Sequence, residues 1–353
     1  MRVSIAYAIT ENYVKQLLTS ITSIFDSARS ETSFSIYVAV YQPSEVFSKL
    51  LQEYIQTNHP QSTLEILSIQ NKDYQRIPVL SGWLPEASFR LLLPRLLPEK
   101  DRILYLDADT IIMDDLSELM CLDMKDIMVA GVMDIEGQHI DARERLIYLA
   151  QLDGSMDYDT MMEHVMQHGY INSGVLLMNL AYWREANITD QLLALFHLPI
   201  SRWVFPDQDF INYAIMKKGI RHVLYLPVTY NCMELYYPQN LKDNRLNLET
   251  AKQVLSYKYR NQLVDMQHFD SERIKIIHMV SQAPWQKYQY PSAYYSLYKP
   301  YAERVQMQLP TRYEYVVYTM KKELHKLCGY KSLLVLTVLL GFISALVFFG
   351  EIW

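Results

Sequence analysis

The chain has few cysteines and lacks the glycine-rich loops that usually hold phosphate groups. Its 353 residues include only Cys121, Cys232 and Cys328, and no Cys-x-x-Cys pair occurs. A disulfide framework or a structural zinc site is therefore not expected, and a reducing compartment is favoured. Neither Gly-x-Gly-x-x-Gly nor Gly-x-x-x-x-Gly-Lys-Ser/Thr is present, so any bound nucleotide has to be held in another way.

An excess of positive charge is also missing. The net charge is −6, so no basic field suggests binding to nucleic acid. The N-terminal residues Met1–Tyr7 show no signal-peptide pattern, and we expect the chain to begin directly with a strand. Half of the residues are hydrophobic, which is enough for one large core or two domains.

Charged residues are absent from a run near the C-terminus, Ser332–Gly350. As a helix this run would be roughly 28 Å long, about the thickness of a hydrocarbon core. We therefore expect residues 332–350 to form a transmembrane or membrane-inserted helix. Basic residues outnumber acidic ones just before it, namely Lys299, Arg304, Arg312, Lys321, Lys322, Lys326 and Lys331 against Glu303, Glu314 and Glu323. This bias predicts a single-pass anchor with the preceding domain at the cytoplasmic face of the cell membrane.

A basic, tyrosine-rich segment, residues 291–331, precedes this run. Its apolar residues recur at helical spacing: Tyr313, Val317, Met320, Leu324 and Leu327. Such a helix would lie on an anionic membrane surface. An ordinary surface helix packed on the domain explains the spacing equally well.

Strands and helices alternate through the rest of the chain, residues 1–290, which predicts an α/β fold. A βαβαβ opening resembles half of a doubly wound nucleotide-binding sheet. Its elements are expected at Ser4–Ile9, Asn12–Ile24, Phe34–Val40, Ser44–Thr57 and Leu64–Ile69. Further strands are expected at Ile103–Leu106, Val129–Met133, Tyr170–Asn179, Val223–Leu226 and Lys275–His278. One helix is expected to end over Ser88–Leu93, where Pro94 and Pro98 break it, and another to span Ile188–Phe196, while Asp141–Met166 is expected to be an insertion or a helical excursion.

Two carboxylates follow the strand Ile103–Leu106. Asp107 and Asp109 are spaced i, i+2, so on an extended chain both side chains point the same way. The carboxyl ends of strands are where ligands bind in open α/β sheets. Paired carboxylates suit Mg²⁺ or Mn²⁺, and those ions suit diphosphates. The pair therefore predicts a metal-bound nucleotide or phosphate ester.

Four other polar groups lie at the ends of apolar runs, and each has an ordinary structural explanation. Asp207-Gln208-Asp209 is typical of a helix N-cap with an acidic first turn. Asn172-Ser173-Gly174 is typical of a turn. His278 ends a strand, where a lone histidine is more often structural than a ligand. As a third metal ligand beside two carboxylates it would favour Mn²⁺ over Mg²⁺. Arg90 either extends along apolar surface or binds phosphate in bidentate fashion.

Taken together in chain order, these groups resemble the retaining glycosyltransferases of family 8, which include bacterial lipopolysaccharide galactosyl- and glucosyltransferases. The resemblance covers roughly residues 3 to 290. Its blocks are Ala8 with Asn12-Tyr13, Arg90, Leu104–Asp109, Asp114-Asp115-Leu116, Asp134, Tyr170–Leu180, Trp183-Arg184, Asp207-Gln208-Asp209, Asn231, His278 and Pro284-Trp285.

The resemblance implies a GT-A fold, a Rossmann-like mixed sheet that binds a nucleotide-diphospho-sugar. It implies that Asp107, Asp109 and His278 hold Mn²⁺, with Mg²⁺ as the alternative, on the diphosphate of UDP. Ala8, Thr10 and Asn12 would face the uridine, and Ala108 would also contact the donor. Arg90, Asp134, Asn172, Ser173, Asp207 and Gln208 would surround the sugar, with Asp134, Asp207 and Gln208 in catalytic positions. Gln208 occupies the position of the nucleophile or β-face stabiliser, and because an amide is a poor nucleophile we favour stabilisation.

The sequence departs from the family in two places. Thr10 stands where an acidic residue usually contacts the uracil, and a hydroxyl can still form that hydrogen bond. The family's C-terminal Lys-Pro-Trp block lacks its lysine here and reads Ser281-Gln282-Ala283-Pro284-Trp285. Lys287 is the candidate to replace that lysine at the diphosphate.

The resemblance thus implies a retaining hexosyltransferase that uses UDP-glucose or UDP-galactose. Its acceptor would be a glycan, glycolipid or glycoprotein in cell-surface polysaccharide synthesis. Two alternatives remain open at this point. Asp-x-Asp after a strand also begins haloacid-dehalogenase-like phosphatases, and the missing lysine is compatible with a partner protein that binds nucleotide-sugar without turning it over.

Overall fold

The computed structural model describes residues 1–134, 140–167, 169–233, 273–280, 283–287 and 294–327. The chain forms two compact units, Met1–His278 and Met279–Trp353. Each unit is described separately below. The first holds nearly all of the residues that the sequence singles out, and Lys287 belongs to the second.

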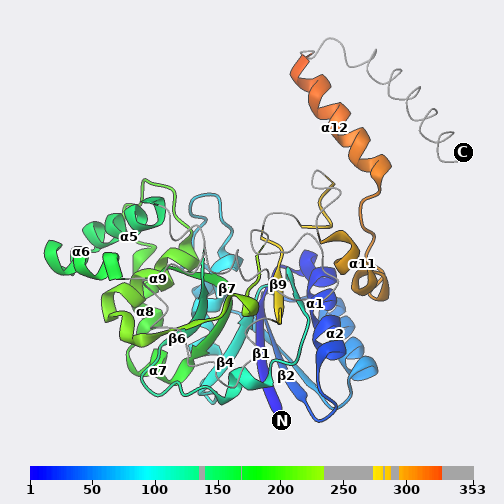
Figure 1. Ribbon diagram of the computed structural model, residues 1–353, viewed down its shortest axis with the longest axis horizontal. Helices are drawn as coiled ribbons and strands as arrows, with labels where there is room; N and C mark the ends of the chain where they lie inside the picture. The colour runs from blue at the N-terminus through cyan, green and yellow to red at the C-terminus, as the bar shows by residue number, and fades with distance from the viewer. Residues whose placement is uncertain (135–139, 168, 234–272, 281–282, 288–293, 328–353) are drawn as a thin grey trace, which may run out of the picture. The chain divides into compact units, whose positions relative to one another are not determined.

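A mixed seven-stranded sheet forms the centre of the first unit, in the order β3-β2-β1-β4-β7-β6-β8 (Figure 1). The strands are β1 (Arg2–Ala8), β2 (Ser33–Tyr41), β3 (Thr63–Ile69), β4 (Arg102–Leu106), β6 (Val129–Met133), β7 (Ile171–Asn179) and β8 (Val223–Leu226). β1, β2, β3 and β4 are parallel to one another, whereas β7 runs antiparallel to both β4 and β6. The predicted α/β class and mixed sheet are confirmed.

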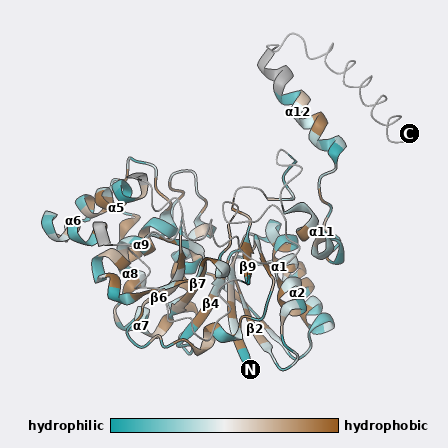
Figure 2. Cartoon of the chain, in the orientation of Figure 1, coloured by the Kyte–Doolittle hydropathy of each residue, from teal (hydrophilic) through white to brown (hydrophobic). Residues whose placement is uncertain are grey.

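The central strands are buried because they are apolar along their whole length. All nine residues of β7 and all five of β6 are buried, as expected for strands covered on both faces. Figure 2 shows hydrophobic colour concentrated on these strands, with hydrophilic residues on the surrounding helices. Burial of this sheet is the main contribution to the stability of the first unit.

Helices lie on both sides of the sheet (Figure 1). α1 (Val14–Ser27) and α2 (Glu45–Asn58) accompany the first three strands, and Ser44 caps α2 by accepting a hydrogen bond from Phe47 N. At the other end of the sheet lie α5 (Ile140–Asp153), α6 (Tyr158–Gln167), α7 (Leu180–Glu185), α8 (Ile188–Leu195) and α9 (Pro206–Lys218). The predicted helical excursion over Asp141–Met166 is thus two helices, α5 and α6.

The expected helix over Ser88–Leu93 was wrong in type. The chain forms a 3₁₀ helix, Pro85–Leu92, followed by the short helix α4 (Leu93–Leu96). Pro94 does not end a helix as expected but lies in the first turn of α4. A proline is tolerated there because the first N–H groups of a helix have no intrahelical partner. The remaining short elements are α3 (Asn71–Tyr74) and the 3₁₀ turns Glu11–Tyr13, Ser117–Cys121, Ile220–His222 and Val228–Tyr230.

A second sheet in the described part of the first unit has two strands. β5 (Thr110–Ile112) pairs with β9 (Ile276–His278) in antiparallel register, with Thr110 opposite His278. β5 begins directly after Asp109, so this pairing carries His278 back to the two carboxylates. The position of His278 near Asp107 and Asp109 therefore depends on this strand pairing, which the sequence of the predicted strand Lys275–His278 alone does not reveal.

The second unit contains α11 (Tyr295–Arg304) and α12 (Arg312–Leu327). The predicted amphipathic helix coincides with α12. Among the residues that the structure describes, no helix is long and apolar enough to cross a bilayer. The predicted anchor at residues 332–350 lies outside the described residues.

Candidate functional site

Asp107 and Asp109 leave the buried strand β4 at the carboxyl edge of the sheet. The Asp107 N–H donates to the Gly174 carbonyl at 2.8 Å, which extends the pairing of β4 with β7 by one residue. Oδ1 of Asp107 accepts hydrogen bonds from Arg90 Nη2 at 2.9 Å and from the Tyr105 hydroxyl at 2.7 Å. Its other oxygen, Oδ2, is left to face Asp109 and His278.

His278 brings a nitrogen ligand to the same point. Its Nε2 lies 3.2 Å from Asp109 Oδ1 and 3.8 Å from Asp107 Oδ2, and one ligand atom from each of the three residues lies within 4.8 Å of the others. Asp109 Oδ1 is buried and accepts no hydrogen bond. Two carboxylate oxygens and one imidazole nitrogen, one of the oxygens buried without a donor, fit a divalent cation such as Mn²⁺.

Gly174 makes room for this cluster. A Cβ at Gly174 would lie 2.2 Å from His278 Cε1 and 2.8 Å from Asp107 Oδ2. Any side chain would therefore displace two of the three ligands. The sequence pattern Asn172-Ser173-Gly174 predicts only a turn, whereas the structure shows that glycine is required here by close approach.

A chain of side-chain amides connects His278 to Asp134. Asp134 Oδ2 accepts from Asn172 Nδ2 at 3.0 Å, and Asn172 Oδ1 accepts from Asn231 Nδ2 at 2.9 Å. Asn231 Oδ1 lies 2.9 Å from His278 Nδ1. A carboxylate only accepts hydrogen bonds, so Asn172 directs its NH₂ group at Asp134 and its carbonyl oxygen at Asn231. Asn231 in turn directs its carbonyl oxygen at His278, so His278 Nδ1 carries the proton. The lone pair of His278 Nε2 then faces Asp107 and Asp109, which is the tautomer that binds a cation.

Gln208 lies next to this chain, in the first turn of α9. Its Oε1 accepts from Ser173 N at 2.9 Å, and its Nε2 donates to Asp134 Oδ2 at 3.1 Å. Ser173 Oγ donates to Asp207 Oδ2 at 2.7 Å. The N-cap interpretation of Asp207-Gln208-Asp209 needs correction: Phe205 is the N-cap, and Pro206 begins the helix. The acidic residues therefore occupy the first turn, and their side chains make tertiary contacts.

Arg90 supplies fixed positive charge between the carboxylates. Besides Asp107, its Nη2 lies 3.3 Å from Asp207 Oδ2, and its Nη1 donates to the Ser173 carbonyl. Burial works against its charge, but the carboxylates of Asp107 and Asp207 raise the pKa of Arg90 above its ordinary value. The guanidinium is therefore charged at every working pH, and it does not merely extend along apolar surface.

The two neighbouring ligands respond to the same surroundings. Burial raises the pKa of Asp107, Arg90 lowers it and Asp109 raises it, and the net direction is upward. Burial lowers the pKa of His278, but Asp109 and Asp107 raise it more, so it lies above the ordinary 6.5. Clustered carboxylates thus attract positive charge, as a proton on His278 or as a cation.

The residues expected at the uridine lie at the end of β1, the strand beside β4. Ala8 is the last residue of β1, and Thr10 precedes the 3₁₀ turn that contains the exposed Asn12. Ala108 is buried between the two carboxylates. The structure thus brings the ends of β1 and β4 together, and contact of these four residues with a nucleotide stays a prediction.

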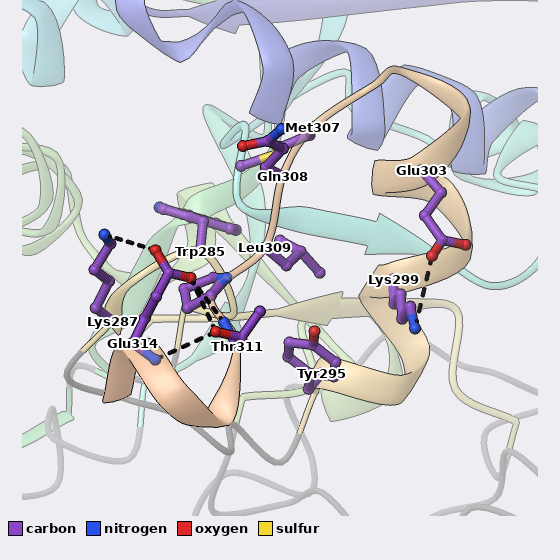
Figure 3. Close-up of a pocket in the computed structure, with 11 residues that line it drawn as sticks. Trp285, Lys287, Tyr295, Lys299, Glu303, Met307, Gln308, Leu309, Thr311 and Glu314 are labelled. Atoms are coloured by element: carbon purple, nitrogen blue, oxygen red, sulfur yellow. Dashed lines mark hydrogen bonds and ion pairs between the residues drawn. The ribbon is translucent and has the colours of Figure 1, made fainter. Parts of the chain in front are cut away.

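Lys287, the candidate for the diphosphate, lies in the second unit. Its Nζ is 2.8 Å from Glu314 Oε1, as Figure 3 shows. Both residues line a hollow of about 550 Å³, together with Trp285, Tyr295 and Lys299. Within its own unit Lys287 is therefore paired with an acidic residue of α12.

The family model of glycosyl transferase family 8 matches residues 4–289. The chain belongs to this family. The family 8 resemblance that the sequence motifs suggested is thereby confirmed.

Two lipopolysaccharide glycosyltransferases are similar to the chain over part of their length. The chain is 30% identical to the lipopolysaccharide 1,2-glucosyltransferase of Escherichia coli strain K12 over 230 residues, which is 65% of this chain and 61% of that protein. It is 23% identical to the lipopolysaccharide 1,3-galactosyltransferase of Salmonella typhimurium strain LT2 over 222 residues, 61% of this chain and 60% of that protein. The match thus spans about three fifths of each relative.

Solved structures share the fold. The crystal structure of galactosyltransferase LgtC, in complex with donor and acceptor sugar analogues, superposes with a TM-score of 0.63 at 18% identity. It covers 88% of this chain and 99% of that chain. The likeness confirms the mixed α/β architecture of the GT-A type.

Several residues of the site escaped the sequence interpretation. Tyr105, Tyr170 and Arg145 contribute hydroxyl and guanidinium groups that face Asp107 and Asp209. Tyr105 belongs to an apolar strand, and Arg145 belongs to the excursion between β6 and β7. Tyr105 lies only two residues from Asp107, but no feature of its apolar strand marks the hydroxyl as part of a site. Arg145 and Tyr170 share the partner Asp209, which is distant from both in the sequence.

Proposed function

We propose that the chain is a retaining hexosyltransferase that moves glucose or galactose from a UDP-sugar to a glycan, glycolipid or glycoprotein acceptor. The observation that supports this most strongly is the convergence of Asp107, Asp109 and His278 within 4.8 Å, beside Gln208 and its partners. Family membership supports the reaction class. Cell-surface glycan synthesis is the context that the named functions of the relatives favour.

The metal site and the sugar site have separate tasks in this proposal. When bound, Mn²⁺ would neutralise charge that develops on the diphosphate as it leaves. Asp107, Asp109 and His278 would hold it, and Asp107 is oriented for this by Arg90 and Tyr105. Mg²⁺ would suit the carboxylates, and the histidine favours Mn²⁺.

Side chains at the ends of β6, β7 and α9 would bind the donor sugar. Asp134, Asn172 and Asp207 present buried carboxylate and amide groups on one side of the cluster. Such groups select a hexose by pairing with its hydroxyls, because a missing partner leaves a buried polar group unsatisfied. Ala8, Thr10 and Asn12 would then contact the uridine.

Retention follows from attack on the face that the diphosphate leaves. The acceptor oxygen forms its bond to the anomeric carbon as the bond from that carbon to the phosphate oxygen breaks, and the hydroxyl proton passes to the departing phosphate. Gln208, on the opposite face, would stabilise the oxocarbenium-like state through its carbonyl oxygen. An amide is a weak nucleophile, so a covalent step through Gln208 is not favoured.

Exposed aromatic side chains near the site support a sugar acceptor. Trp203 and Trp83 are 58% and 39% exposed, and their rings lie 6.1 Å and 5.7 Å from the ring of Phe205. Phe205 is the N-cap of α9, two residues before Asp207. Apolar faces of sugar rings pack on such aromatic surfaces, so we propose that these tryptophans contact the acceptor.

The predicted anchor fits a membrane-bound acceptor. A helix at 332–350 would hold the catalytic unit at the cytoplasmic face of the cell membrane. Tethering of this kind raises the effective concentration of enzyme near a lipid-linked acceptor.

The phosphatase alternative is not favoured. Asp107 follows β4, the fourth strand of the chain, whereas the phosphatase motif usually follows the first core strand. It would also leave Asn172, Gln208 and His278 without a role. The partner-protein alternative is addressed by turnover, since it predicts nucleotide binding alone.

The test is donor turnover by the full chain. UDP release from UDP-glucose, UDP-galactose and UDP-N-acetylglucosamine is measured with Mn²⁺, with Mg²⁺ and with chelator, alongside hydrolysis of p-nitrophenyl phosphate. We expect metal-dependent turnover of one UDP-hexose and none of the phosphate ester. Ester hydrolysis without UDP release would support the phosphatase, and UDP binding without turnover would support the partner protein.

A further inference from the structure

The amide of Gln208 is held at both of its ends. Oε1 accepts from Ser173 N at 2.9 Å, while Nε2 donates to Asp134 Oδ2 at 3.1 Å and to the Tyr170 hydroxyl at 3.3 Å. Both N–H bonds of the amide are therefore used within the protein. The Gln208 residue is only half-buried.

The Tyr170 hydroxyl can accept from Gln208 only because its own proton is committed elsewhere. It donates to Asp209 Oδ1 at 2.6 Å, and Asp209 is completely buried. A carboxylate has no proton to give, so the direction of this hydrogen bond is fixed. The Tyr170 oxygen then accepts from Gln208 Nε2 at 3.3 Å and from Arg145 Nη2 at 3.4 Å.

Hydrogen-bond donors surround the Asp209 carboxylate. Arg145 Nε lies 2.9 Å from Oδ2 and 3.1 Å from Oδ1, and Phe205 N donates to Oδ2 at 2.7 Å. The Arg145 guanidinium also lies 4.9 Å from the centre of the Phe205 ring. With these donors, Asp209 acts as a hydrogen-bond acceptor. Through Arg145, α5 contacts this part of the site.

We propose that Asp209 and Tyr170 are positioning residues that fix the direction of the Gln208 amide. The inference rests on the proposed function, in which the Gln208 carbonyl oxygen faces the donor sugar. In this account Arg145 acts one step further back, by holding Asp209 as the acceptor.

The opposite direction of the amide is disfavoured at three contacts. It would place the NH₂ group against Ser173 N–H, and the carbonyl oxygen against the oxygens of Asp134 and Tyr170. A donor would then face a donor at Ser173, and an acceptor would face an acceptor at Asp134 and at Tyr170. Ser173 Oγ also lies 3.3 Å from Oε1, but its single proton goes to Asp207 at 2.7 Å. The amide oxygen therefore keeps a lone pair for a ligand.

A spectroscopic test does not depend on turnover. The full chain is labelled with ¹⁵N-glutamine, and the side-chain NH₂ signal of Gln208 is identified by its loss in Gln208→Glu. We expect Tyr170→Phe to shift this signal, because one N–H loses its acceptor. Tyr213→Phe is the matched control: it removes a buried hydroxyl from α9 that donates to Asp153 at 2.7 Å, away from Gln208. An unmoved signal in Tyr170→Phe, or an equal shift in Tyr213→Phe, would overturn the proposal.

A kinetic cycle distinguishes positioning from general support of the fold. We expect Tyr170→Phe to lower kcat about tenfold, with the KM for the donor unchanged, because only the transition state is affected. In a Gln208→Ala background the same substitution should have no further effect. An equal loss in both backgrounds would show a structural role instead. If the wild-type chain turns over no UDP-sugar, the proposed function fails, and the Gln208 signal still decides the positioning.

Discussion

His278 Nδ1 lies 2.9 Å from Asn231 Oδ1, and this contact decides which nitrogen of the imidazole is available to a cation. Asn231 has its own orientation fixed by Asn172 and, beyond it, by Asp134. Asp134, which we propose binds the donor sugar, and the proposed metal ligand His278 are therefore joined by one chain of hydrogen bonds. Changes at one end should be measurable at the other.

Removal of Asn231 should weaken cation binding. Asn231→Ala leaves His278 free to rotate and to exchange tautomers, and loss of such an outer partner lowers metal affinity by about 10- to 100-fold. Titration calorimetry with Mn²⁺ measures the effect. Asn179→Ala, which removes the buried N-cap of α7, serves as the control and should lower the melting temperature with Mn²⁺ affinity unchanged. Equal Mn²⁺ affinity in both variants would contradict the account.

A methyl group at Gly174 should abolish the metal site. In Gly174→Ala the new Cβ would meet His278 and Asp107 at 2.2 Å and 2.8 Å, so the ligands have to separate. We expect no Mn²⁺ binding by calorimetry in a protein that still folds. The matched control is Gly131→Ala in β6, where a Cβ meets only apolar side-chain atoms at 3.1 Å. Gly174→Ala with wild-type Mn²⁺ affinity would show that the cluster is not the site.

Asp115 should contribute stability that disappears in acid. Burial raises the pKa of Asp115, but hydrogen bonds from Arg29 N, Ser117 and Thr32 lower it by more. Its pKa in the folded state therefore lies below the ordinary 3.8. The contribution is present above the unfolded pKa and is lost as pH falls through the folded value.

The corresponding measurement is urea unfolding of Asp115→Asn and wild type at pH 7 and at low pH. At pH 7 we expect the variant to lose about 1–3 kcal/mol, because its NH₂ group faces donors. The difference should shrink as the wild-type carboxyl becomes protonated. A difference that is independent of pH would show that the charge of Asp115 has no part in it.

The exposed tryptophans should affect the acceptor and not the donor. Trp203→Ala should raise the KM for a glycan acceptor about tenfold, the loss expected from one aromatic contact of about 1–1.5 kcal/mol, with the donor KM unchanged. Initial-rate kinetics at saturating donor measures it. Tyr158→Ala removes a similarly exposed aromatic residue of α6 as the control. A parallel rise in donor KM would remove the acceptor role of Trp203.

The sheet and the carboxylate pair could be predicted because each leaves a local pattern. β6 and β8 lie where the apolar runs Val129–Met133 and Val223–Leu226 predict them. The pair Asp107 and Asp109 is marked by its spacing after a strand. Only the family resemblance groups His278 with them, since the pairing of β5 with β9 joins segments far apart in the sequence.

What could not be predicted depends on tertiary contact. Pro94 resembles a helix breaker until it is seen in the first turn of a helix. Arg145 belongs to a polar segment, and only the packing of α5 near α9 brings it to Asp209. Gly174 appears as a turn residue because the side chains that need its space come from β4 and β9. Residue type and spacing do not encode these distances.

The central claim is that Asp107, Asp109 and His278 hold the cation on which UDP-sugar turnover depends. The most direct test compares UDP release by the wild-type full chain and by Asp109→Asn, each titrated with Mn²⁺. Asp123→Asn, at an exposed carboxylate, is the matched control. We predict metal-dependent turnover in the wild type and in the control, and a fall of about 100-fold or more in Asp109→Asn. Turnover in Asp109→Asn equal to that of the wild type, with the same response to Mn²⁺, would contradict the account.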